Sequence, residues 1–149
     1  MKKDLLPREG RFFKANLHCH SVLSDGKLTP KELKAAYKAM GYSVLAITDH
    51  DIMVPHPELN DEDFLTLTGY EMEVNEPGDA PWPNKKSCHM CLIALDEENK
   101  KQVCWHPEWY LFGHSAEHKD LIQVDEETAP YIRRYSGEGI SEMMKIGRD

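Results

Sequence analysis

Two histidines that alternate along a short apolar segment are the strongest chemical signal in the sequence. His18 and His20 flank Cys19 in FFKANLHCH, and this pattern predicts a strand over residues 12–20. Because side chains alternate between the faces of a strand, both imidazoles would point the same way and could reach one cation or a bridged pair. Asp25 follows in SDGK, a turn that could fold its carboxylate back to the same place. The first hypothesis is therefore a metal site near the end of this strand.

Further imidazole and carboxylate groups lie at the ends of the next predicted strands. The continuous apolar run YSVLAIT predicts a buried strand, and it ends in TDHD with His50. FLTLTGYEMEV predicts a third strand with Glu71 and Glu73 near its end, and SCHMCLIALD predicts a fourth with His89 and Cys91 on one face. Each residue alone is more often structural than ligating. Together, such a set of His, Asp and Glu is what divalent metals at hydrolytic sites require.

The segment between the first two strands has the signals of a helix with defined ends. Thr29 is a good N-cap, Pro30 suits the first helical position and Glu32 completes a capping box. Gly41 suits the position just after the last helical turn. A strand, a crossover helix and a second strand form a βαβ unit, whose strands are parallel. The pattern predicts an α/β fold that gathers its chemistry at the carboxyl ends of its strands.

The later part of the chain gives weaker signals. Residues 99–135 are interpreted as an irregular insertion, in which QVCWHPEWYLFGH could form a hairpin. An amphipathic helix is predicted from about Ser141 onward. The four cysteines show no disulfide framework, and no apolar run approaches the ~20 residues of a membrane span. We therefore expect a cytoplasmic protein without a membrane partner.

Length and charge narrow the class of protein further. With 149 residues and 40% hydrophobic content, residues 1–149 are expected to form a single globular domain. The net charge of -8 disfavours sequence-independent nucleic-acid binding, which needs a positive patch against the phosphates. A phosphorylated small molecule is still compatible with this net charge as a substrate, because carboxylates that hold cations create a locally positive site. The composition therefore favours a small phosphorylated substrate over a nucleic acid.

Two other motifs have weaker chemical interpretations. Cys88 and Cys91 form a CxxC pair, but residues three apart on a strand face opposite sides, which disfavours a shared metal or a redox role. The tryptophans are more typical of packing beneath long loops than of a stacking platform for bases; they are Trp82, Trp105 and Trp109.

Several remaining cationic and imidazole side chains are interpreted as solvent-facing or as loop residues. Arg133 and Arg134 precede an acidic segment, and such a basic pair is more often a solvated face than a phosphate site. His114 and His118 lie in a polar stretch, and His56 lies in a loop between two prolines. None of these residues is included among the candidate ligands.

Several motifs follow one another along the chain: LHCHSVLSDGKLTPKEL, AITDHD, GYEMEV and then a strand that carries a His. This order resembles the PHP family, named for its occurrence in bacterial polymerases and histidinol phosphatase. The resemblance covers most of residues 13–95, and YSGEGISEMM is similar to some family members. It implies a distorted (β/α)7 barrel with two or three metal ions at the carboxyl ends of its strands. The residues that match the family's ligands are His18, His20, Asp25, His50, Glu71 and His89.

Beyond residue 95 the sequence departs from the family pattern. A complete domain carries a further His, usually in an HP pair, and a late Asp-x-His pair. This chain has no DxH, and His106-Pro107 comes too early for the HP motif. Because such barrels typically need about 250 residues, we expect a partial, mostly parallel barrel that lacks its C-terminal strands and forms the amino-terminal part of a larger one. A second copy of the chain could cover the exposed edge as a homo-oligomer.

The resemblance implies a metal-dependent phosphoesterase. The working hypothesis is attack on a phosphate ester by a hydroxide that bridges two cations. His18, His20, His50 and Glu71 are the expected catalytic residues, with Glu71 as the bridging carboxylate. Oxygen and imidazole donors suit manganese, iron or zinc, and two or three such ions are expected. Two alternatives stay open: a nuclease-type phosphodiesterase, and a non-catalytic or incompletely assembled metal-binding domain.

Overall fold

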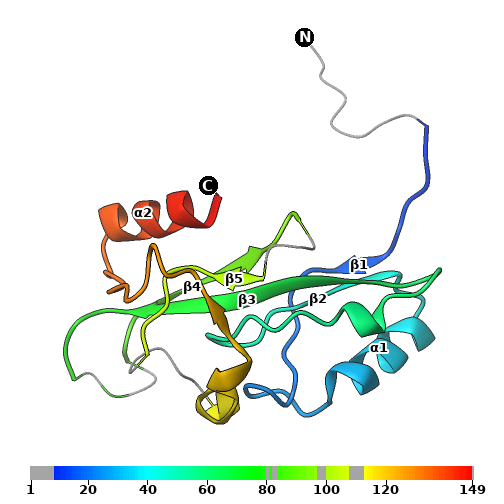
Figure 1. The fold of residues 1–149 in the computed structure, drawn as a ribbon, viewed down its shortest axis with the longest axis horizontal. Helices are drawn as coiled ribbons and strands as arrows, with labels where there is room; N and C mark the ends of the chain where they lie inside the picture. Colours follow the sequence, from blue (N-terminus) through cyan, green and yellow to red (C-terminus); the bar gives the residue numbers. More distant parts are fainter. Residues whose placement is uncertain (1–8, 80, 82–83, 97–99, 108–112, 149) are drawn as a thin grey trace.

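A small mixed sheet forms the frame of the protein (Figure 1). The computed structural model describes residues 9–79, 81, 84–96, 100–107 and 113–148. These residues form a four-stranded sheet of β1 (Ala15–Asn16), β2 (Val44–Ile47), β3 (Leu65–Asn75) and β4 (Ser87–Ile93), in that order. The first three strands are parallel, and β4 is antiparallel to β3. The α/β class with a partial, mostly parallel sheet is therefore confirmed.

Strand β3 presents two chemically different faces. Tyr70, Met72 and Val74 are buried in one apolar cluster. Because side chains alternate along a strand, Glu71 and Glu73 point to the opposite face. The apolar face thus anchors β3 in the core, and the acidic face is left for chemistry.

Helix α1 (Pro30–Ala39) connects β1 to β2 and begins where the sequence predicts. The Thr29 hydroxyl accepts a hydrogen bond from the Glu32 amide, and the Glu32 carboxylate accepts one from the Thr29 amide, so the capping box is confirmed. Leu33 of α1 and Leu45 of β2 are buried in the same cluster. This crossover brings the carboxyl ends of β1 and β2 to the same edge of the sheet. A 3-10 turn, η1 (Pro57–Leu59), follows β2.

Strand β1 is shorter than the strand predicted over residues 12–20. The side-chain amide of Asn16 donates hydrogen bonds to the His18 carbonyl at 3.0 Å and to the Tyr37 hydroxyl at 2.7 Å. These contacts fold the chain out of the ladder after Asn16. His18 and His20 therefore lie just beyond the carboxyl end of β1 rather than within a strand.

Helix α2 (Gly137–Arg148) lies near the end of β3, whereas α1 lies near its start (Figure 1). Met143 of α2 is fully buried in the cluster that contains Tyr70. The helix begins at Gly137 rather than near Ser141, because the Ser136 hydroxyl accepts a hydrogen bond from the Gly139 amide and caps an earlier turn. Within the described ranges, no helix has the length and apolar character needed to cross a membrane.

The described residues between β4 and α2 form a parallel strand pair instead of the predicted hairpin. Strand β5 (Lys101–Gln102) pairs in parallel with β6 (Gln123–Val124), and the 3-10 helix η2 (Gly113–Leu121) lies between them in sequence. Parallel strands need a crossover rather than a tight turn, and η2 belongs to that crossover. Residues 108–112 of the predicted hairpin lie outside the described residues, as do Trp82 and Trp109.

Candidate metal centre

The buried carboxylate of Glu71 is the centre of the candidate site. Its Oε2 atom lies 2.9 Å from His20 Nε2 and 3.3 Å from His50 Nδ1, and its Oε1 atom lies 2.8 Å from His89 Nδ1. His18 Nε2 is 3.9 Å from Oε2. Only 5% of the surface of Glu71 is exposed. Four imidazoles from three segments of the chain, with His18 and His20 in one of them, therefore surround one carboxylate.

Backbone pairing delivers His50 to this carboxylate. A parallel bridge joins His50 and Glu71, in which the Glu71 amide donates to the Asp49 carbonyl at 3.0 Å and the Asp51 amide donates to the Glu71 carbonyl at 2.8 Å. Asp51 then adopts a φ of 56°, which turns the chain away from the sheet. His50 is thus held at the carboxyl end of β2, as the sequence predicts.

Asp49 holds the turn that carries Asp25. Its carboxylate accepts hydrogen bonds from the Ser21 amide at 2.7 Å, the Ser21 hydroxyl at 2.7 Å and the Ser24 hydroxyl at 2.6 Å. A Cβ atom at Gly26 would come within 2.3 Å of a backbone carbonyl oxygen, so the tight turn requires glycine there. These contacts fix the turn against β2 and place Asp25 beside the histidines.

Asp25 joins the cluster through two imidazoles. Its Oδ1 atom lies 2.6 Å from His20 Nδ1, and its Oδ2 atom lies 3.9 Å from His50 Nε2. Burial raises the pKa of the Asp25 carboxyl, but the hydrogen bond with His20 and the charges of His20 and His50 together lower this pKa below its usual value. Asp25 is therefore ionised at neutral pH and can serve as an acceptor or a ligand.

Strand β4 contributes His89 and Cys91 to the same face. The antiparallel register pairs Glu73 with His89 and Glu71 with Cys91, and directly paired residues share one side of a sheet. His89 Nε2 is 3.7 Å from Glu73 Oε2, and Cys91 Sγ is 3.2 Å from His18 Nδ1. Neither Glu73 nor Cys91 is among the ligands expected from the sequence. Their two-residue spacing from Glu71 and His89 is the signal that could have found them.

The donor set suits divalent cations. In the described part of the chain, three groups offer donor atoms within 4.8 Å of one another: His18, Glu71 and Cys91; His20, His50 and Glu71; and His50, Glu73 and His89. His20 Nε2 is buried and makes no hydrogen bond, although Glu71 Oε2 is only 2.9 Å away. Burial lowers the pKa of His50 more than the neighbouring Glu71 raises it, so its imidazole is neutral at neutral pH. Neutral imidazoles and carboxylates are the forms that bind metals.

One interpretation from the sequence is wrong in this region. Arg133 does not face solvent, because its guanidinium is buried and paired with Asp51. Arg134 is exposed and pairs with Glu142. Arg133 is therefore a buried partner of Asp51, the residue directly after His50, and is not part of a solvated surface.

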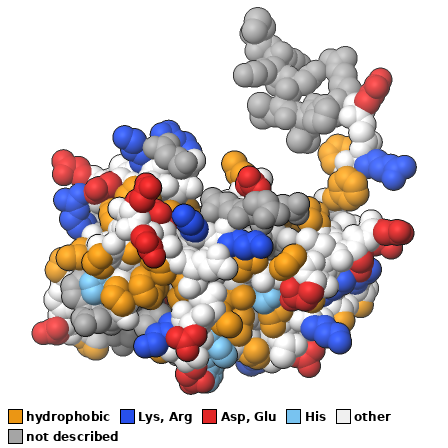
Figure 2. Space-filling view, in the orientation of Figure 1, with side chains coloured by type: hydrophobic (Ala, Val, Ile, Leu, Met, Phe, Trp, Pro, Cys, Tyr) orange, Lys and Arg blue, Asp and Glu red, His pale blue; other side chains and the backbone are white. Residues whose placement is uncertain are grey.

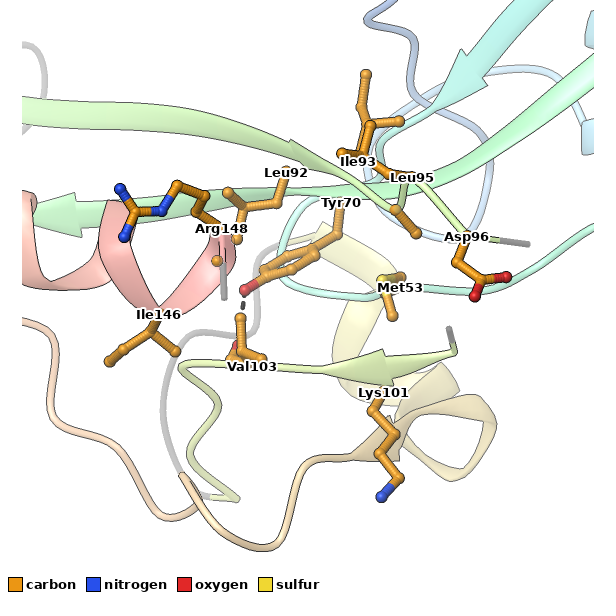
Figure 3. Close-up of a pocket in the computed structure, with 12 residues that line it drawn as sticks. Met53, Tyr70, Leu92, Ile93, Leu95, Asp96, Lys101, Val103, Ile146 and Arg148 are labelled. Carbon is orange, nitrogen blue, oxygen red and sulfur yellow. Dashed lines mark hydrogen bonds between the residues drawn. The ribbon is translucent and has the colours of Figure 1, made fainter. Parts of the chain in front are cut away.

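A cavity of about 350 Å³ with a mixed apolar and charged lining is separate from the candidate metal centre. Figure 3 shows the ring of Tyr70 in this cavity between Leu92 and Val103, with its hydroxyl donating to the Val103 carbonyl at 2.6 Å. Tyr70 and Glu71 are neighbours on β3 and therefore face opposite sides of the sheet. None of the predicted ligands lines the cavity.

Imidazole and carboxylate side chains that follow β1 and β2 or lie on β3 and β4 define an α/β domain with a candidate metal centre. The PHP domain family matches residues 16–144 of the chain. This protein therefore belongs to the PHP domain family, whose members are generally metal-dependent phosphoesterases.

Two kinds of relatives share part of this sequence. A 5'-3' exoribonuclease of Haemophilus influenzae is 39% identical over 94 residues, which cover 60% of this chain and 32% of that protein. Error-prone DNA polymerases of Mycobacterium tuberculosis and Mycobacterium bovis are 32% identical over 95 residues, which cover 60% of this chain and 9% of the polymerase. The chain thus matches about a third of the length of the exoribonuclease and about a tenth of the polymerases.

These relatives overturn the expectation of a small phosphorylated substrate in preference to a nucleic acid. An exoribonuclease and a DNA polymerase both act on nucleic acids. The net charge of -8 is misleading because it averages over the whole chain, whereas substrate binding responds to the local field at a cation cluster. Figure 2 shows basic and acidic side chains interspersed over one face of the protein, rather than a uniformly acidic surface.

Proposed function

We propose that this PHP domain hydrolyses phosphodiester bonds of a nucleic acid in a metal-dependent reaction. The observation that carries the proposal is the convergence of four imidazoles on the buried Glu71 carboxylate. Metal-dependent phosphoesterase chemistry is general in the family, and the similarity to an exoribonuclease favours a nucleic acid as the substrate. The residues that would hold two or three cations are His18, His20, Asp25, His50, Glu71 and His89.

The two oxygens of Glu71 suggest that this carboxylate is shared between cations. Oε2 faces His20 and His50, whereas Oε1 faces His89. A carboxylate whose oxygens face different donor groups suits a bridging position. When bound, manganese, iron or zinc would polarise the phosphoryl oxygens, lower the pKa of water and offset the charge that grows during in-line attack.

Hydrogen bonds hold two of the imidazoles in a ligating orientation. Asp25 Oδ1 accepts from His20 Nδ1 at 2.6 Å, which leaves His20 Nε2 directed at Glu71. Thr48 Oγ1 lies 2.8 Å from His18 Nδ1 and plays the same part for that ring. With Nδ1 engaged, the Nε2 lone pair of each ring is available to an ion. Asp25 and Thr48 therefore act in this proposal as positioning residues.

A nuclease assay with defined metals tests the proposal. The chelator-treated chain would be incubated with a short single-stranded RNA and with an aryl phosphodiester, each with manganese, iron(II) or zinc. We expect metal-dependent cleavage that Glu71→Gln reduces by at least about a hundredfold. Glu58→Gln, which changes an exposed carboxylate beside His56, should leave cleavage unchanged.

The assay also separates the proposal from its main alternative. Metal content and circular dichroism would be measured on the same samples. Bound metal without cleavage of either substrate would favour a non-catalytic metal-binding domain and contradict the proposed reaction.

A further inference from the structure

We infer that Cys91 is a metal ligand, which binds a cation together with His18 and Glu71. This inference rests on the proposed metal centre and goes beyond it, because it assigns a thiolate to a site otherwise composed of imidazoles and carboxylates. The consequence is selectivity: a thiolate favours zinc or iron(II) over manganese or magnesium.

The register of the sheet places the thiol at the ligand cluster. Cys91 lies directly opposite Glu71 in the β3–β4 ladder, so both side chains are on the same face. Cys91 Sγ is 3.2 Å from His18 Nδ1. A one-residue change in register would place this thiol on the apolar face, because side chains alternate along the strand.

The separations between donors suit one shared ion. His18, Glu71 and Cys91 each offer a donor atom within 4.8 Å of the other two. With metal–nitrogen bonds of about 2.1 Å and metal–sulfur bonds of about 2.3 Å, two donors to one cation lie at most about 4.4 Å apart. Because Cys91 approaches His18 at Nδ1, which also contacts Thr48, rotation of the His18 and Cys91 side chains would bring His18 Nε2, the thiol and Glu71 into range of one ion.

A second feature of the cluster points independently to an ion. His20 Nε2 is buried without a hydrogen bond, and it faces the same Oε2 atom of Glu71 that lies 3.9 Å from His18 Nε2. Buried polar atoms in folded proteins nearly always have a partner. A cation beside Glu71 Oε2 would provide one.

The other cysteines have environments that explain them without a metal. Cys19 and Cys88 pack against the two apolar clusters, and Cys104 is fully buried in one of them. Cys88 is on the same strand as Cys91 but contacts the apolar cluster. It therefore serves as a matched control.

Cobalt(II) titration of the metal-free full chain tests the inference. Cobalt bound to a thiolate gives a ligand-to-metal charge-transfer band in the near ultraviolet, and cobalt bound by any of these donors gives visible bands. We expect both signals in the wild-type chain and in Cys88→Ser. In Cys91→Ser and Cys91→Ala we expect the visible bands without the charge-transfer band.

Competition between metals gives a second measurement. We expect Cys91→Ser to weaken zinc binding by at least about tenfold while manganese affinity stays within about twofold. Visible bands without a charge-transfer band in the wild type, or a charge-transfer band that persists in Cys91→Ser, would overturn the inference and leave the metal centre standing. If no variant binds cobalt or zinc, the metal centre itself fails.

Discussion

Arg133 and Asp51 form a buried ion pair that joins the segment before α2 to the residue directly after His50. The side chain of Arg133 is fully buried, and that of Asp51 is 3% exposed. The same guanidinium donates to the Glu73 carbonyl at 2.8 Å and to the Cys104 carbonyl at 3.1 Å. Arg133 therefore links the segment before α2 to Asp51, directly after His50, and to Glu73, on the same strand as Glu71.

Loss of Arg133 should destabilise the fold strongly. Arg133→Met leaves the Asp51 carboxylate buried without its partner, and such changes cost about 3–5 kcal/mol. Urea unfolding followed by circular dichroism would measure the free energy of unfolding. Arg134→Met, which changes the exposed neighbour paired with Glu142, is the control and should have a far smaller effect. Equal losses in both variants would contradict the structural role of the buried pair.

The double variant Asp51→Asn/Arg133→Met should recover part of this loss, and its response to pH should differ. Burial raises the pKa of Asp51 to about 6, and Arg133 acts in the opposite direction. Because the folded pKa exceeds the ordinary 3.8, the stability from this group is present below pH 3.8 and is lost as pH rises through about 6. Without Arg133 the pKa of Asp51 in the folded protein would be higher still, so the loss of stability would continue to higher pH. Between about pH 5 and pH 8, the free energy of unfolding of Arg133→Met should therefore fall relative to that of the double variant. If the two variants show the same dependence of this free energy on pH, the prediction is wrong.

His50 should make the metal-free protein sensitive to acid. Burial lowers the pKa of His50 below its usual 6.5, so the unfolded chain takes up a proton there that the folded chain resists. Stability from this group is present above pH 6.5 and is lost as pH falls toward the folded pKa. The urea midpoint should therefore fall less on acidification in His50→Gln than in the wild type. His114→Gln, at an exposed imidazole, should behave like the wild type.

Asp49 should matter for folding although it is not a predicted ligand. Asp49→Asn replaces the carboxylate that accepts three hydrogen bonds from Ser21 and Ser24. We expect a loss of about 2 kcal/mol in the free energy of unfolding, because a neutral amide replaces the charged carboxylate that accepts from these buried donors. Because the turn also positions Asp25, metal affinity should decrease in the same variant. An unchanged affinity would show that Asp25 is not held through this turn.

The sequence is sufficient to predict where the candidate ligands after β1 and β2 lie, because those positions combine two strong local signals. The capping box at Thr29 and the apolar run before His50 define the βαβ unit, and parallel strands bring their carboxyl ends together. The convergence of His18, His50 and Glu71 follows from that topology.

The remaining features depend on long-range register and packing, which a single sequence does not reveal. Glu73 and Cys91 face the site only because β4 pairs antiparallel to β3 in one particular register. The burial of Arg133 could not be predicted from its neighbours in sequence, because its partner Asp51 lies 82 residues earlier in the chain. Net charge also gave an expectation that the relatives contradict, since it carries no information about where charges lie.

Anomalous diffraction from crystals of the full chain grown with manganese or zinc tests the central claim most directly. Maps recorded at the absorption edge of the metal locate each ion without reference to the protein coordinates. We predict ions within about 2.0–2.3 Å of the Glu71 oxygens and of imidazole nitrogens from His18, His20, His50 or His89. Ions found only elsewhere, or none beside Glu71 at saturating metal, would contradict the account.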